Sequence, residues 1–139
     1  MTAEPYPSEQ ANAPVFEQVV ANLCRCPGMY GVSTFESACA YLNGYNSSCD
    51  GGPLIGLQQW LIVRANGGNN IFWTKLAELE IVAERFKQAQ EPSPEQMIQA
   101  LGQLLAEFFE YRRINGITKI FHEYAKWLLK KTWYEGPLR

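Results

Sequence analysis

Apolar side chains recur along most of the chain at intervals of three and four residues, which is the spacing of one face of an α-helix. The first segment with this pattern opens at Pro14, which suits the first turn of a helix because the missing N–H would be unpaired there anyway. Pro27 and Gly28 end the segment. Its expected buried face consists of Phe16, Val19, Val20 and Leu23. Residues 1–11, ahead of this helix, are expected to form a flexible tail.

Two further helices are expected before residue 66. Ser33 and Glu36 form a capping-box pattern, in which each side chain satisfies a backbone donor at a helix start. The stripe that follows is Phe35, Ala38, Cys39 and Leu42. After Pro53, the segment LIGLQQWLIVRA is apolar in nearly every direction, which is typical of a central helix or of one that lies against a partner. A short strand over residues 60–63 would show the same run, but the chain has no second β-rich run to pair with it, so a helix is favoured.

Three more helices complete the pattern. The helix after the glycines at 67–68 is expected to bury Phe72, Leu76, Leu79, Ala83 and Phe86. A second capping box, with Ser93, Pro94 and Gln96, opens a helix with the stripe Met97, Leu101, Leu104, Leu105 and Phe108. After Gly116, the last helix groups Ile117, Ile120, Phe121, Tyr124, Trp127 and Leu128, with Lys119, Lys126 and Lys130 opposite. The sequence therefore predicts an all-α, single-domain bundle of about six helices joined by short loops, with residues 12–139 as one helical domain.

The stretch WLIVRANGGNNIFW joins two of these helices through two glycines and two asparagines. Gly67 and Gly68 suit the left-handed conformation that closes a helix, and Asn69 or Asn70 can cap the next one. A functional alternative makes the same corner an anion or ligand site, built from Arg64, Gly68, Asn69 and Asn70. The structural interpretation is favoured, because a phosphate-binding loop would carry a Lys-Ser/Thr pair or follow a strand.

The amino-acid composition favours a protein that binds a partner. The 139 residues are 47% apolar and 19% charged, which suffices for one compact core and leaves an apolar surplus. Residues 1–111 carry five Lys or Arg against twelve Asp or Glu, whereas residues 112–139 carry seven against two, so the net charge of -2 is the sum of -7 and +5. Such a division can steer a partner electrostatically, although a solvated basic face on the last helix explains it as well.

The expected location is the cytoplasm. The N-terminal stretch is acidic and proline-rich where a signal peptide would be basic and apolar, and no apolar run is long enough to span a membrane. Four cysteines, at positions 24, 26, 39 and 49, suit a reducing compartment, because a chain of this length builds a core without disulfides.

The sequence gives little support for a catalytic site or a metal site. The cysteines offer only one close pair, so buried thiols are a better interpretation than a zinc site. His122, the single histidine, falls on the polar side of its helix with no carboxylate partner on the same face. Glu80 with Glu84, and Glu107 with Glu110, lack the Glu-x-x-His pattern of a carboxylate metal bundle. We therefore expect no enzyme activity, no metal and no cofactor.

Four stretches together resemble a family of small, uncharacterised bacterial all-α proteins. They are PGMYG at 27–31, LNGY at 42–45, GLQQWLIVRANGGNNIFW at 56–73 and YAKWLLKKTWYEGP at 124–137. The resemblance covers most of the chain from about residue 27 and implies no catalytic residues. Proteins of this size and kind include immunity partners of bacterial toxins, so the resemblance implies such a partner role.

The expected function is that of a non-catalytic protein-binding module, either immunity- or antitoxin-like or homodimeric. Its expected interaction surface is made of amphipathic rings, which combine apolar area with a polar group: Trp60, Trp127, Trp133 and Tyr134. The alternative is a small-molecule or anion-binding protein that uses Arg64 and the Asn69-Asn70 corner. A third option is nucleic-acid binding through lysines beside Trp127 and Trp133, namely Lys119, Lys126, Lys130 and Lys131. A helix-turn-helix is not expected, because the helix after the glycines is acidic.

Overall fold

The computed structural model describes residues 7–86, 91–131 and 133, and in this part of the chain it contains helices and no strands. The elements are α1 (Pro7–Arg25), the short 3-10 helix η1 (Pro27–Tyr30), α2 (Phe35–Ser48), α3 (Leu57–Ala65), α4 (Trp73–Arg85), α5 (Pro94–Asn115) and α6 (Ile117–Leu129). The prediction of an all-α bundle of about six helices joined by short loops is confirmed. Residues 60–63 are helical, so the alternative of a strand is wrong.

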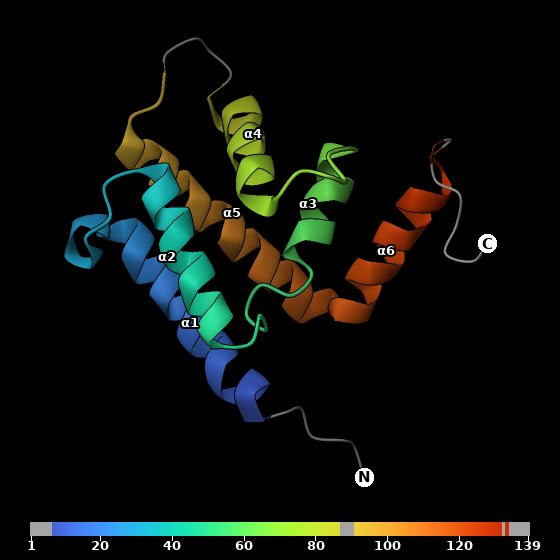
Figure 1. Ribbon diagram of the computed structural model, residues 1–139, viewed down its shortest axis with the longest axis horizontal. Helices are drawn as coiled ribbons and strands as arrows, with labels where there is room; N and C mark the ends of the chain where they lie inside the picture. The colour runs from blue at the N-terminus through green and yellow to red at the C-terminus, as the bar shows by residue number, and fades with distance from the viewer. Residues whose placement is uncertain (1–6, 87–90, 132, 134–139) are drawn as a thin grey trace.

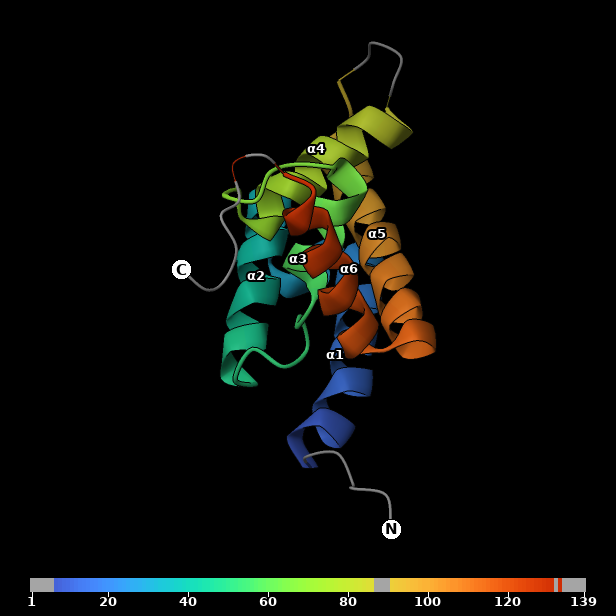
Figure 2. The same cartoon turned by 90° about the vertical axis from the view of Figure 1, so that its right-hand side faces the viewer.

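Helix α5 is the central element. Helices α1 and α2 pack along one part of it, α4 packs along another, and α3 lies between α4 and α6 (Figures 1 and 2). The side of α5 that faces these helices is buried: Ile98, Leu101, Leu104, Leu105 and Phe108 are each at most 1% exposed. Since apolar burial contributes about 25 cal/mol per Å², this buried stripe stabilises the bundle. None of the described helices has the length and apolar character needed to cross a membrane.

The capping signals were predicted with mixed success. At the start of α5 the Ser93 hydroxyl accepts a bond from the Gln96 N–H at 3.2 Å, and the Gln96 side chain accepts one from the Ser93 N–H at 2.8 Å, as predicted. At the start of α2 the box is instead formed by Thr34 and Ser37, one residue later than predicted. Thr34 has the extended backbone that a cap residue needs, and its hydroxyl accepts the Ser37 N–H at 3.0 Å.

Two helix starts differ from the prediction. Helix α1 begins at Pro7 rather than Pro14, so residues 7–11 of the expected tail are helical, while residues 1–6 lie outside the described residues. Helix α3 begins at Leu57 rather than beside Pro53, because residues 53–56 form turns that end in a left-handed Gly56 with φ of 90°.

The predicted buried faces hold for α2 and α5 and are wrong in part for α4 and α6. Helix α4 buries Trp73, Leu76, Ala77 and Ile81. The side chains of Phe72 and Leu79 are 60% and 50% exposed, so the buried stripe is rotated from the predicted one. Helix α6 buries only Ile120 and Trp127. Helix α6 lies at the edge of the bundle (Figure 1) and packs mainly on α3 and α5. Its apolar side chains Ile117, Phe121 and Leu129 are therefore left exposed.

Candidate functional site

The loop between α3 and α4 takes its shape from two left-handed residues. Asn66 closes α3 with φ of 53°, and the N–H of Gly67 donates to the Ile62 carbonyl at 3.2 Å. Gly68 is the second, with φ of +80°. The prediction that the glycine pair closes the helix is therefore corrected, because Asn66 tolerates this conformation and takes that position one residue earlier.

Close packing explains the glycine at position 68. A β-carbon there would lie 2.5 Å from the Cδ2 atom of Leu76, a buried residue of α4. The prediction that Asn69 or Asn70 caps α4 is wrong, because the cap residue is Phe72 and no side chain bonds to the helix start. Asn69 instead accepts a hydrogen bond from the Tyr124 hydroxyl of α6. The Asn69 side chain thus binds the loop to α6.

Helix α6 brings aromatic rings and a lysine to this loop. The indole N–H of Trp127 and the ammonium group of Lys131 both donate to Oδ1 of Asn66, each at 2.8 Å. The ammonium also lies 4.7 Å from the centre of the Trp127 ring, close enough for a cation–π interaction. Tyr124 stacks on Trp127, with ring centres 6.1 Å apart and planes inclined by 19°. The ring of Trp133 meets Trp127 edge-on at 6.1 Å.

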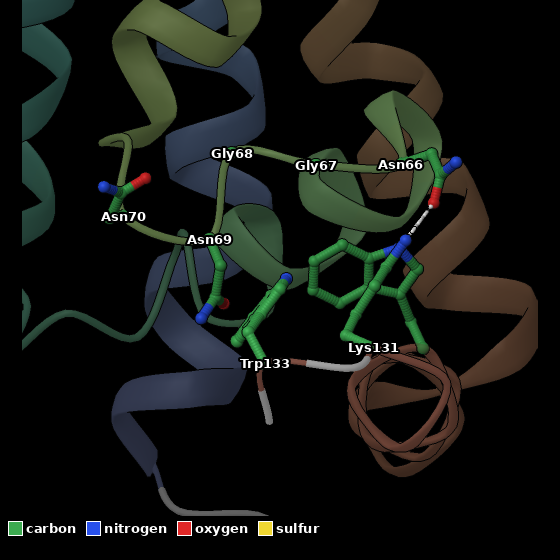
Figure 3. Close-up of a pocket in the computed structure, with 8 residues that line it drawn as sticks. Asn66, Gly67, Gly68, Asn69, Asn70, Lys131 and Trp133 are labelled. Atoms are coloured by element: carbon green, nitrogen blue, oxygen red, sulfur yellow. Dashed lines mark hydrogen bonds between the residues drawn. The ribbon is translucent and has the colours of Figure 1, made fainter. Parts of the chain in front are cut away.

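Between the loop and the end of α6 lies an open pocket of about 430 Å³ (Figure 3). In Figure 3 residues 66–70 run along one side, with Lys131 and Trp133 on the other. The lining residues are Asn66, Gly67, Gly68, Asn69, Asn70, Trp127, Lys131 and Trp133. Indole rings can cover an apolar or aromatic group, while the amides and the ammonium can hold an acceptor or an anionic group. The arrangement is equipped to bind and orient a ligand.

Three of the predicted ligand residues, Gly68, Asn69 and Asn70, line this pocket, but Arg64 does not. Nε of Arg64 lies 2.7 Å from a carboxylate oxygen of Glu80, and Nη2 lies 3.6 Å from Glu107. Its guanidinium also sits 4.4 Å above the Trp60 ring. The placement of Arg64 at the asparagine corner is therefore corrected, since its cationic group is directed at α4 and α5.

Three lining residues, Asn66, Gly67 and Lys131, belong to neither the predicted ligand site nor the predicted interaction surface. Asn66 and Lys131 come from the end of α3 and the residues after α6, and they meet across 65 positions of chain. The predicted run of lysines at the end of the last helix was a partial signal for Lys131, because it located a cation near Trp127. Nothing local in the sequence marked Asn66 as the acceptor between them.

The residues of the predicted interaction surface do not all lie together in the structure. Trp127 and Trp133 line the pocket. Trp60 is only 7% exposed and packs against Phe108 with ring centres 5.5 Å apart, so its assignment to a surface is wrong: the all-round apolar α3 is a core helix. Tyr134 lies outside the described residues.

The other candidate groups lie apart from the pocket. Burial raises the pKa of the Cys24 and Cys39 thiols to about 12, so both are protonated and unreactive near neutral pH. Cys26 is exposed. His122 is exposed on α6, as predicted. In the described part of the chain, no three His, Cys, Asp or Glu side chains gather where a metal ion could be held.

No protein family, curated protein or solved structure matches the chain.

Proposed function

We propose that this protein is a non-catalytic, cytoplasmic bacterial binding module that recognises a partner protein through the pocket between residues 66–70 and the end of α6. One observation carries the proposal: Trp127, Trp133 and Lys131 gather on a loop of amides and glycines. Tryptophan dominates the energetics of protein interfaces, since it offers a large apolar area together with one donor. A partner side chain inserted here would contact both indoles.

The pocket is held in shape before any partner arrives. Trp127 is buried, stacked on Tyr124 and hydrogen-bonded to Asn66, and Lys131 is held by the same amide oxygen. A side chain that is already fixed loses little conformational entropy on binding. This arrangement supports recognition, because the contact area is available at low entropic cost.

The partner is either a second copy of this chain or another protein, such as the toxin that an immunity protein would bind. The apolar surplus of the sequence and its division into acidic and basic parts support both. A cytoplasmic location is supported by the thiols, which are free at all four cysteines and exposed at Cys26.

Site-specific photo-crosslinking in cells of the source organism tests the proposal. A photo-reactive amino acid is placed at residue 70, which is exposed and lines the pocket. The matched control carries it at residue 29 on η1, where the Met29 side chain is 85% exposed. We expect a covalent protein adduct from residue 70 only, and its loss when Trp133→Ala and Lys131→Ala are added. Equal adducts from both positions, or none from residue 70, would contradict the proposal.

A small anionic ligand is the second candidate, and the size of the pocket favours it. Its volume of about 430 Å³ lies within the range of small-molecule sites, roughly 300 to 1,000 Å³. Lys131 supplies the cation that was assigned to Arg64. A thermal-shift screen with phosphorylated metabolites and aromatic carboxylates tests this, because a ligand of the folded state raises Tm. The shift should vanish in Lys131→Ala and persist in Arg64→Ala. A screen without such a ligand leaves the protein partner as the proposal.

A further inference from the structure

A groove runs between α2 and α4, and it shares no lining residue with the pocket beside α6. It consists of two adjoining cavities of about 270 Å³ and 480 Å³ that share Phe35, Glu36 and Glu78 as lining residues. The first cavity extends towards Asn43 and Phe72, and the second towards Pro94. Shared walls make them one continuous depression along the two helices.

The floor of this groove is apolar and its rim is acidic. Phe35, Cys39 and Met97 form buried parts of the lining, and the exposed Phe72 and Val82 extend it on α4. The charged lining residues are three carboxylates and one ammonium: Glu36, Glu78, Glu91 and Lys75. An apolar floor with a net negative rim fits a helix that presents an apolar stripe beside basic side chains.

The two central carboxylates act on the floor of the groove. The pKa of Cys39 is raised chiefly by burial, and the negative charges of Glu36 and then of Glu78 add to that rise. Both carboxylates line both cavities and so stand where the two cavities join. Lys75 lies 3.4 Å from Glu78 and compensates its charge in part. The four charged lining residues together carry a net charge of -2.

The outer face of α6 has the complementary chemistry. Ile117, Phe121 and Leu129 are exposed there, Leu129 by 70%. Lys119 and Lys126 are exposed further round the same helix. The side chains on this face are distinct from Ile120 and Trp127, which pack inward. Helix α6 thus offers exposed apolar side chains with cations along one edge, beyond Leu129.

We propose that the outer face of α6 from one copy of the chain docks in the α2–α4 groove of a second copy. The charges are complementary, because α6 carries Lys119 and Lys126 against Glu123, whereas the groove rim carries three carboxylates and one ammonium. The lengths also agree, because α4 and α6 each have 13 residues, or about 20 Å at 1.5 Å per residue. Helix α3 stands between α6 and the α2–α4 pair in Figures 1 and 2, so the contact joins different patches of two molecules.

Sedimentation equilibrium of the full chain at low salt tests the docking. We expect wild type to self-associate with concentration, and association to weaken at least about tenfold in Glu36→Lys/Glu78→Lys and in Lys119→Glu/Lys126→Glu, since each places like charges together. Joining all four substitutions restores opposite charges, so that variant should associate again. A mixture of the two double variants should do the same.

A matched control carries Glu84→Lys and Glu110→Lys, which make the same change of net charge at exposed positions outside the groove lining. It should associate like wild type, as should Trp133→Ala, because this inference is independent of the pocket beside α6. A monomeric wild type overturns the proposal, even if the groove then binds a basic helix of another protein. A groove variant that behaves like the control, or a fourfold variant that stays monomeric, overturns it as well.

Discussion

Asn66 and Trp127 are joined by a hydrogen bond of 2.8 Å between positions 61 residues apart. The same Asn66 oxygen accepts a bond from Lys131, so one amide ties the end of α3 to the end of α6. Asn66 also has a left-handed backbone that few residues adopt at low cost. A single side chain thus closes a helix and shapes one wall of the pocket.

Replacing Asn66 separates these two roles. Asn66→Gly keeps a backbone that suits the left-handed conformation and removes the acceptor, so we expect a loss of about 1 to 2 kcal/mol in the free energy of unfolding. Asn66→Ala adds the cost of a β-carbon in this conformation, about 1 kcal/mol more. Urea unfolding followed by tryptophan fluorescence measures both values. Equal stabilities of Asn66→Gly and wild type would show that the hydrogen bonds contribute nothing.

The adjacent glycines provide a matched pair. Gly68→Ala should destabilise the protein by at least about 1 kcal/mol, because φ is +80° and the new methyl group would meet Leu76. Gly67→Ala should stay within about 0.5 kcal/mol of wild type, since no atom lies within 4 Å of a β-carbon there. Thermal unfolding of the two variants under one set of conditions gives the comparison. Similar losses from both would contradict the described loop geometry.

Arg64 is expected to matter for stability and not for the pocket. Its partner Glu80 has a side chain only 15% exposed, so Arg64→Ala leaves a largely buried carboxylate without this cation, at about 1 to 2 kcal/mol. Arg64→Lys keeps the charge and should recover part of that loss. Lys75→Ala, which breaks an exposed pair with Glu78, is the control and should change stability by less than about 0.5 kcal/mol. Chemical denaturation distinguishes these outcomes.

The sequence predicted features that depend on residues near one another in the chain better than features that depend on contacts between distant segments. The capping box of Ser93 and Gln96 was predicted correctly because it involves two residues three positions apart. The stripe of α2 was predicted because periodicity alone fixes which residues share a face. On α4 the apolar residues surround more of the helix, so the buried side is decided by the neighbouring helices, which the pattern does not contain.

The site was predicted less well, for the same reason. Gly68, Asn69 and Asn70 were identified because they are adjacent in sequence and belong to one loop. Arg64 was added to them by proximity along the chain, but the helical turn directs its side chain to Glu80 instead. Lys131 joins the loop only through the packing of α6 on α3, a contact between distant segments. Such contacts follow from tertiary structure rather than from local spacing.

The two buried thiols give the protein a specific sensitivity to alkaline pH. Cys24 and Cys39 have a pKa of about 12 in the folded chain, raised from the ordinary value of 9.0 by burial, with nearby charges adding to the rise for Cys39. Below pH 9 both thiols are protonated whether the chain is folded or not, so their contribution to stability is fully present. Above pH 9 only the unfolded chain ionises them, and stability falls towards pH 12.

This fall should amount to about 1.4 kcal/mol per pH unit for each thiol. Cys24→Ala/Cys39→Ala should start from a lower stability, because buried atoms are lost, but should decline less steeply between pH 9 and 10.5. Urea unfolding at several pH values under reducing conditions measures the two slopes, and groups that titrate in both proteins cancel in their difference. Parallel declines would mean that the thiols ionise equally in the folded and unfolded chain, which is incompatible with their burial between α1, α2 and α5.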